Sequence, residues 1–525
     1  MKKINILLAG VGLLFTFSSC NDFLDKLPDD RAEVDNFEKA TQLVSSAYPD
    51  GSTDYMMEYC SDNVMDNGKT FNYQTNQDQL FRWKDVNTTG NDDPRYVWGQ
   101  MYYAIGNANQ AIADLSKVKD GDVEAVKAEA LLCRAWSMFR LATAFCMAYD
   151  DSKADKYLGL PYPKEPNRSI DTRGTLRELY ENINADIEAA LPHVSESYMT
   201  VPKYHFNLKS AYAFAALFNL YYQKWDKAAE YASKALGSQP ASLLRTVYRY
   251  KTLGGRWAIH DAYINSSENA NFMLQTAVSS AGAATFYGGY QRFNSGYNVI
   301  LNELYWTKMP WGAGSVDNTL YESHLLYGNS QQIAYPRLSN EFEYTDAARS
   351  RGFIRTVDAV LTADETLLVR AEAEIHLKKY TEALNDMNLW INAHCAPNVE
   401  KNGVVTATRP TLTLQSVNDF LATVPLVPEE ITNKSDFGFK KALHPQGFSI
   451  DETQTNLLYI LLQMRRIETC QLGMRFMDIK RYGIRITHLI DGEDPVYFKS
   501  GDLRGALQLP SDVIEAGLEP NPREN

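Results

Sequence analysis

The chain has 525 residues and a formal net charge of −13, from 65 acidic and 52 basic side chains. Phosphate binding needs clustered Lys and Arg, so this balance disfavours nucleic acid and anionic lipid as partners. The length is several times that of a typical domain, which allows either one large core or an array of repeats.

The first twenty residues have the pattern of a bacterial lipoprotein signal. Lys2 and Lys3 precede an apolar run from Ile4 to Phe17, and Ser18-Ser19-Cys20 then resembles a lipobox. A signal anchor is the alternative, but the apolar run is short for a bilayer span. We predict a signal peptide at 1–19, lipidation of Cys20, a polar tether at 20–34 and a single body at 35–525.

Apolar residues recur at helical spacing along much of this body. The first segments with that spacing are 35–48, 98–118, 124–149 and 175–191, and the last is the helix predicted at 456–472. These periodicities predict a mainly α-helical fold with little β structure.

One helical hairpin is repeated. The segment 207–236 reads as a helix, a turn and a second helix, and a shift of 155 residues brings the pattern back at 364–393. Trp225 then corresponds to Tyr380. Small residues on the second helix allow close packing and an aromatic ring fills the gap at the turn, which is typical of tetratricopeptide helix pairs. A chance match of two amphipathic hairpins is the alternative.

The helical segments and the irregular ones alternate along the chain. Helix pairs are predicted near 124–191, 207–236, 364–393 and 456–483, and a loop-rich lobe near 50–97, 243–346 and 397–454. Long loops in a compact body commonly carry function. We therefore expect the ligand-binding residues in this lobe.

The sequence contains none of the motifs that mark common catalytic or metal sites. It has no HExxH, no GxSxG, no phosphate-binding glycine loop and no CxxC pair. The five cysteines after Cys20 are scattered and odd in number, so they are expected to be buried thiols. Scattered Asp residues without EF-hand spacing give no support for a calcium ion. We expect no enzymatic activity and no cofactor. A hydrolase stays an alternative, because glycosidase carboxylates are neighbours in space and not in sequence.

Aromatic residues make up 12% of the chain and crowd into the predicted loops. A flat ring in a loop can stack on the C–H face of a sugar while nearby polar side chains bind the hydroxyl groups. The alternative is that most of these rings fill the core beneath long loops. The candidate ligand-binding residues are Trp83, Asn87, Arg95, Tyr287, Tyr290, Trp306 and Trp311.

A run of arginines near the C-terminus allows two interpretations. Arg475 and Asp478, like Asp478 and Arg481, stand three residues apart, the spacing at which helical charges meet. This favours structural ion pairs. An anion site built from Arg465, Arg466 and Arg475 is the functional alternative.

The chain resembles the SusD/RagB nutrient-binding outer-membrane lipoproteins of Bacteroidetes. The resemblance spans nearly the whole chain after Cys20. Its motifs are Cys20-Asn-Asp-Phe-Leu-Asp25, Trp98-Gly-Gln-Met-Tyr102, Lys127-Ala-Glu-Ala-Leu-Leu-Cys-Arg134, Gly159-Leu-Pro-Tyr-Pro163, the 465–483 run and Gln508-Leu-Pro510. Met464 and Leu472 depart from the family pattern, which usually has acidic residues there, and Cys133 stands where Phe or Leu is favoured.

This resemblance implies four tetratricopeptide-like helix pairs beneath an irregular ligand-binding lobe. It also implies a cell-surface lipoprotein, anchored in the outer membrane by its N-terminal lipid, that captures oligosaccharides for a SusC-like TonB-dependent transporter. Ligand residues vary within the family, so the seven candidates rest on the aromatic-loop argument alone. A peptide-binding RagB-like receptor and a helical-repeat envelope scaffold remain the alternatives.

Overall fold

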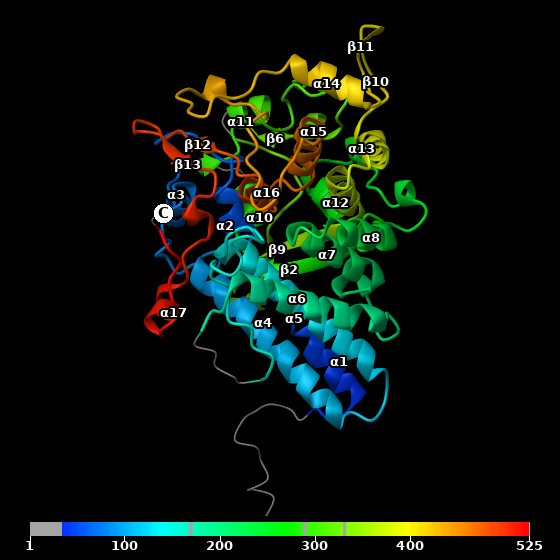
Figure 1. The fold of residues 1–525 in the computed structure, drawn as a ribbon, viewed down its shortest axis with the longest axis vertical. Coiled ribbons are helices and arrows are strands. Elements are labelled where there is room, and N and C mark those ends of the chain that lie inside the picture. Colours follow the sequence, from blue (N-terminus) through cyan, green and yellow to red (C-terminus); the bar gives the residue numbers. More distant parts are fainter. Residues whose placement is uncertain (1–33, 167–171, 287–290, 329–331, 524–525) are drawn as a thin grey trace, which may run out of the picture.

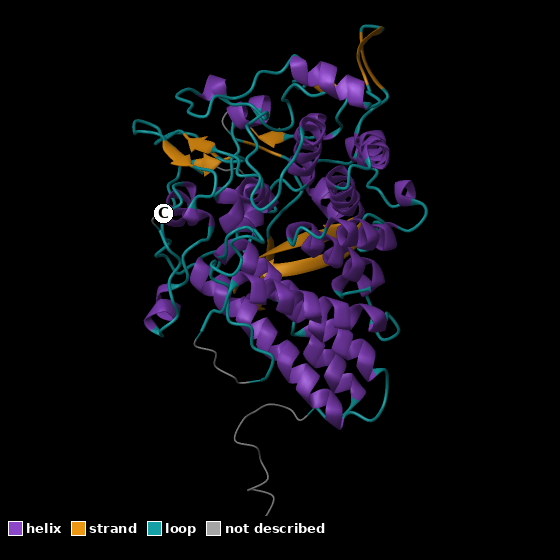
Figure 2. Cartoon of the chain, viewed as in Figure 1, coloured by secondary structure: helices purple, strands orange, loops and turns teal. Residues whose placement is uncertain are grey.

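The computed structural model describes residues 34–523, except 167–171, 287–290 and 329–331. The predicted signal peptide, Cys20 and most of the tether lie outside these residues. The chain is mainly helical: helices fill the lower part of Figure 1, and loops are more abundant in the upper part (Figure 2).

Consecutive helices form the platform of the fold. The bounds of its helices are α1 (Phe37–Ser45), α4 (Pro94–Asp114), α5 (Val123–Phe145), α6 (Leu176–Ala190), α7 (Leu208–Tyr221), α8 (Trp225–Leu236), α12 (Ala363–His376), α13 (Tyr380–His394), α15 (Glu452–Glu468) and α16 (Met474–Arg481). Helix α5 packs on α6, α7 on α8 and α12 on α13, and α12 also contacts α7, α8 and α15. The predicted mainly α fold with tetratricopeptide-like helix pairs is confirmed.

The 155-residue repeat is visible in the backbone of the two turns. Gln223 and Lys378, which are 155 residues apart, both have left-handed backbones, with φ of 62° and 60°. The next residue in each turn donates its N–H to an equivalent carbonyl: Lys224 to that of Asn219 at 2.9 Å and Lys379 to that of Glu374 at 2.8 Å. The two hairpins therefore close in the same way, as the shift of 155 residues predicts.

A three-stranded antiparallel sheet was missed by the sequence analysis. It has the order β2-β9-β8, with bounds Asn271–Val278, Arg351–Thr362 and Glu341–Asp346. The first half of β9 is exposed or half-buried at all but one position and its second half is mostly buried, so the strand lacks a single alternating pattern. The sheet lies beside α7 in the middle of the molecule (Figure 1).

Short elements and loops build the remainder. The short helices are α2 (Asp54–Tyr59), α3 (Thr75–Phe81), α9 (Arg256–Tyr263), α10 (Ala281–Phe286), α11 (Tyr297–Asn302), α14 (Leu414–Ala422) and α17 (Ser511–Glu515). The paired short strands are β1 (Met65–Asp66) with β3 (Phe293–Asn294), β4 (Gly312–Ala313) with β5 (Asp317–Asn318), β6 (Tyr327–Gly328) with β7 (Ile333–Ala334), β10 (Asn398–Lys401) with β11 (Val404–Thr408), and β12 (Ile486–His488) with β13 (Val496–Phe498). Most of these short elements lie in the predicted loop-rich segments.

One hydrophobic core runs through the platform and continues beneath the loops, and a smaller cluster lies between α1, α4 and α5. Helix α5 is buried along nearly its whole length, because other elements cover it on all sides. Of the helices in the described ranges, none combines the length and the apolar character needed to cross a bilayer.

Candidate functional site

Two of the predicted stacking residues lie inside the protein. Trp83 is 3% exposed, stacks on His488 with ring centroids 4.4 Å apart, and donates its indole N–H to the carbonyl of Cys60. Trp311 is 1% exposed and packs against Trp390. The expectation that these rings present a face to a ligand is therefore wrong for both. They fill the core beneath the loops, as the alternative interpretation held.

Two other candidates, Asn87 and Arg95, make contacts at the surface. The side-chain oxygen of Asn87 accepts a hydrogen bond from Gln79 on the surface. The guanidinium of Arg95 pairs with Asp512 at 2.9 Å, and both are exposed. Tyr287 and Tyr290 lie outside the described residues.

The seventh candidate, Trp306, lines a hollow of about 650 Å³, which we call the loop hollow. Three stretches supply most of its wall: 301–308 at and after the end of α11, 423–428 after α14, and 435–440. Helices α11 and α14 lie in the upper, loop-rich part of Figure 1. Two of the segments predicted as loop-rich, 243–346 and 397–454, thus converge on one concave surface.

The wall of the loop hollow is mainly apolar. The indole of Trp306 is partly exposed and is fixed by its N–H, which donates to the carbonyl of Ser323 at 2.9 Å. Its ring meets that of Tyr297 edge to face. Phe437 and Leu426 stand on the segments from the second predicted loop region, and the Leu426 side chain is 53% exposed. An apolar wall with a fixed indole suits a ligand that presents flat C–H surfaces.

Polar side chains are spaced around this wall. They are Asn302, Thr307, Lys308, Thr423, Ser435, Asp436 and Lys440. The ammonium group of Lys308 is exposed and lies 3.2 Å from the hydroxyl of Thr423, whereas that of Lys440 donates to the carbonyls of Leu421 and Val424. Lys308 can therefore reach a ligand more readily than Lys440, whose donors hold the wall together.

A buried ion cluster anchors the loop hollow to the platform. Lys441, which follows the wall residue Lys440, contacts Asp62 at 2.6 Å and Glu303 at 3.0 Å. Glu303, which follows the wall residue Asn302, also contacts Arg466 of α15 at 2.9 Å. Two walls of the hollow are thus bound to one helix through charged groups that are almost fully buried.

The same cluster decides between the two interpretations of the C-terminal arginines. The guanidinium of Arg475 holds both oxygens of Asp62, and Arg466 lies 3.2 Å from the same carboxylate. Arg465 contacts Glu372 and Asp478. Nearby guanidinium and ammonium groups hold the pKa of Asp62 well below its usual range, against the opposing effect of burial. These arginines already have carboxylate partners, so they act as structural ion pairs and form no anion site.

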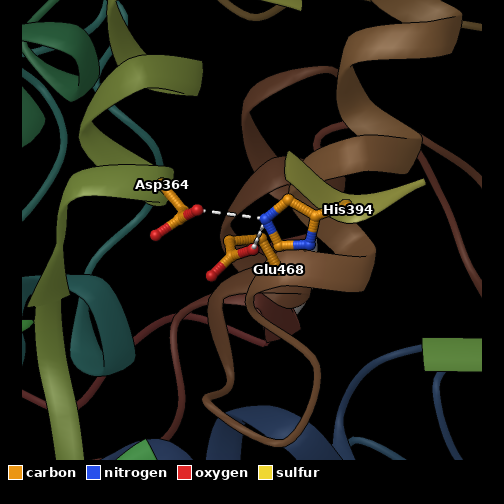
Figure 3. Close-up of side chains that lie close together, drawn as sticks. All are labelled: Asp364, His394 and Glu468. Atoms are coloured by element: carbon orange, nitrogen blue, oxygen red, sulfur yellow. Dashed lines mark hydrogen bonds and ion pairs between the residues drawn. The ribbon is translucent and has the colours of Figure 1, made fainter. Parts of the chain in front are cut away.

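A second buried cluster has the residue types of a metal site. Asp364, His394 and Glu468 point toward one another in Figure 3, and each offers an atom within 4.8 Å of the others. His394 Nε2 lies 3.0 Å from Asp364 and 3.6 Å from Glu468, and Nδ1 lies 2.5 Å from Glu322. The carboxylates raise the pKa of His394 to about 10 although burial opposes this. An imidazolium protonated at both nitrogens donates one N–H toward Glu322 and the other toward Asp364 and Glu468, so these contacts are those of buried ion pairs.

Sequence reasoning missed most of the loop hollow. Leu426 and Val427 stand in the stretch Pro425-Leu-Val-Pro428, an apolar run between two prolines inside a predicted loop. An exposed apolar run of this kind is a signal that a surface is built for contact. The candidate residues were chosen for stacking on sugars and binding their hydroxyl groups, so these aliphatic side chains were not among them.

Residues 22–220 match a SusD-like family model described as "Starch-binding associating with outer membrane". This match covers 199 of the 525 residues, so the N-terminal part of the chain is similar to SusD-like proteins. No curated protein matches the sequence.

The whole chain shares its fold with solved structures at low sequence identity. A SusD superfamily protein from Bacteroides vulgatus is 17% identical, with a TM-score of 0.61, 93% of this chain and 98% of that chain covered. A SusD-like carbohydrate-binding protein from Bacteroides vulgatus is 16% identical, with a TM-score of 0.58 and coverage of 88% and 89%. A laminarin-binding SusD-like protein is 16% identical, with a TM-score of 0.54 and coverage of 93% and 99%. At these identities the likeness shows a shared fold.

Proposed function

We propose that this SusD-like protein is a non-catalytic receptor at the cell surface that captures oligosaccharides and delivers them to a SusC-like TonB-dependent outer-membrane transporter. The observation that carries the proposal is the loop hollow, which presents a fixed, partly exposed indole and a ring of polar side chains. The family description and the carbohydrate-binding and laminarin-binding relatives support a saccharide as the ligand.

Capture follows from the chemistry of this wall. The Trp306 indole and the Phe437 ring offer apolar faces, on which the C–H surface of a sugar ring can stack. Lys308, Thr423 and Asp436 supply donors and acceptors for hydroxyl groups. Because each hydroxyl exchanges water for protein, the binding energy per site is modest, and the ligand is released unchanged.

Affinity electrophoresis tests this assignment. The full chain without its signal peptide is run through gels that contain laminarin or amylopectin. Trp306→Ala is expected to weaken retardation about tenfold, which corresponds to about 1.4 kcal/mol of lost stacking and contact, whereas Trp306→Phe should keep part of it. Tyr248→Ala is the control, because Tyr248 is 51% exposed and lines no part of the loop hollow. Equal retardation of wild type and Trp306→Ala would refute the loop hollow as the site. Release of shorter sugars from either polysaccharide would refute the non-catalytic assignment.

Peptide capture is the second candidate, and a specific observation favours it. The stretch Pro425 to Pro428 gives the loop hollow aliphatic walls that suit apolar amino-acid side chains. A fluorescent casein digest tests it by polarisation. Under the peptide assignment, Leu426→Ser reduces binding of the digest and neither polysaccharide is retarded. Under the saccharide assignment, the polysaccharides are retarded and the digest is not bound.

The anchor and the transporter are tested separately in the native host. Radiolabelled palmitate should enter the wild-type protein and not Cys20→Ala. A tagged wild-type protein should co-purify from detergent-solubilised outer membranes with a TonB-dependent barrel. Labelling that persists in Cys20→Ala would contradict the predicted lipidation site, and purification without a barrel would contradict the delivery role.

A further inference from the structure

A second hollow, separate from the first, lies on the helical side of the molecule. It has a volume of about 450 Å³, and we call it the tyrosine hollow. Its walls come from the end of α1 and the residues after it, from α4, from the short helix at Pro202–Tyr204 and the next residue, and from β2. The lining residues are Ser45, Ser46, Tyr48, Pro49, Asp50, Gln100, Tyr103, Tyr204, His205, Leu274, Gln275 and Thr276. None of them lines the loop hollow.

Two tyrosines of this hollow are unusually open to solvent. Tyr103 is 67% exposed, which makes it the most exposed aromatic side chain of the described residues, and Tyr204 is 40% exposed. Tyr103 projects from the interior of the 21-residue helix α4, and Tyr204 from the short helix before α7. A tyrosine ring in such a place offers an apolar face and a hydroxyl group to a ligand at little cost in side-chain entropy.

The floor of the tyrosine hollow is held in place by buried hydrogen bonds. Gln275 accepts from the indole N–H of Trp136 at 3.1 Å and donates to the carbonyl of Pro49 at 3.0 Å. His205 Nδ1 lies 2.7 Å from Glu129, and Tyr48 donates to the same carboxylate at 2.7 Å. These partners fix the walls before any ligand arrives, which reduces the entropy lost on binding.

Other polar groups at the hollow remain available. The side chains of Gln100 and Thr276 form no hydrogen bond with another described residue, and neither does the hydroxyl group of Tyr103. One oxygen of Asp50 binds Arg355, and this arginine also binds Glu343. The hollow therefore offers an amide and several hydroxyl groups, while the nearby arginine is already neutralised. This chemistry suits an uncharged ligand rich in hydroxyl groups.

We propose that the tyrosine hollow is a second saccharide-binding site, which takes neutral glycan units through the rings of Tyr103 and Tyr204 and the amide of Gln100. The proposal rests on the proposed function, because it assumes that the protein captures glycans. It adds a contact point on different elements: α1 and α4 lie in the lower part of Figure 1, whereas α11 and α14 lie in the upper part. Two contact points strengthen the retention of a long polysaccharide more than that of a short fragment.

The test measures stoichiometry and retardation together. Maltoheptaose and a laminarin-derived heptasaccharide are titrated by calorimetry, and laminarin and amylopectin are used in affinity gels. The variants are Tyr103→Ala and Gln100→Ala for the tyrosine hollow, Trp306→Ala for the loop hollow, and Tyr248→Ala as the control. Tyr103 and Gln100 lie at the surface, and a thermal melt of each variant checks that the fold is kept.

With the glycan that binds, the wild type is expected to take two heptasaccharides per chain and Tyr103→Ala one. Tyr103→Ala and Gln100→Ala should each weaken retardation by the polysaccharide at least threefold, and Tyr248→Ala should not. One heptasaccharide per chain, lost in Trp306→Ala and unchanged in Tyr103→Ala, would overturn this inference and leave the proposed function intact. Binding lost in Tyr103→Ala and unchanged in Trp306→Ala would support the tyrosine hollow and refute the loop hollow. No binding of any of the four glycans would overturn both.

Discussion

Two substitutions in the ion cluster beneath the loop hollow are expected to lower the stability of the protein by different amounts. Its five groups are two carboxylates, Asp62 and Glu303, and three cations, Lys441, Arg466 and Arg475. Replacing Glu303 by Gln keeps the shape of the side chain and changes the balance from one excess positive charge to two. Replacing Lys441 by Met keeps an unbranched side chain that is one atom shorter, and it leaves two carboxylates with two arginines.

The two substitutions should therefore differ in cost. Removing one partner of a buried ion pair costs about 3–5 kcal/mol, because the other charge is left without compensation. Glu303→Gln leaves Lys441 and Arg466 with a single carboxylate, so we expect the full cost. Lys441→Met leaves each carboxylate with an arginine, so we expect less than half of it. For a chain of about 500 residues the unfolding entropy is about 1 kcal/mol/K, so Glu303→Gln should lower the melting temperature by about 3–5 °C.

Differential scanning calorimetry at pH 7 measures both variants against the wild type. Because Glu303 and Lys441 adjoin wall residues of the loop hollow, Glu303→Gln should also weaken the retardation by polysaccharide that depends on Trp306. Two results would refute the reasoning. One is a melting temperature of Glu303→Gln within 0.5 °C of the wild type. The other is a larger loss in Lys441→Met than in Glu303→Gln.

Three further outcomes follow from the structure. The carboxylates around His394 raise its pKa in the folded state to about 10. Its ion pairs therefore stabilise the fold fully below about pH 6.5 and lose this effect as the pH rises toward 10. Thermal melts from pH 7 to 10 should show the wild type losing stability relative to His394→Gln. Lys378 has a left-handed backbone, which glycine adopts without strain and alanine does not. Both substitutions remove the exposed ion pair with Asp451, so Lys378→Gly should be about 1 kcal/mol more stable than Lys378→Ala in urea unfolding. The five cysteines of the described residues are buried and unpaired, and burial raises the pKa of each thiol. In a Cys20→Ser protein, a thiol-reactive dye should therefore label none of them in the native state and all five after unfolding.

The helical platform could be predicted because its signals are local. A helix with one buried face repeats its apolar residues every three or four positions, and the 155-residue repeat adds a second, independent signal. The equal turn geometry at Gln223 and Lys378 agrees with this repeat. Strand β9 was not predicted, because its two halves have different surroundings and its apolar residues therefore follow no uniform period.

The candidate site was harder to predict because exposure is a property of the whole fold. Trp83 and Trp306 both stand in predicted loops, and both are indoles near polar residues. His488 covers one face of Trp83. The two residues are about 400 positions apart in the sequence, so no local pattern predicts this contact. Tyr103 was assigned to a helix and was not considered as a ligand residue, although it is the most open aromatic ring described.

The C-terminal arginine run explains why the family resemblance is easy to see while the ligand is not. Arg466 and Arg475 reach Asp62 across more than 400 residues, and Arg466 also reaches Glu303. Each of these bonds needs one residue type at one place, because a misplaced buried charge is costly. The wall of the loop hollow makes no such demand, since an exposed Leu426 can be exchanged for another residue at little cost in stability. Binding specificity can therefore vary on the loops while the ion cluster keeps them attached to α15, and under the proposed function the walls of the two hollows select the glycan.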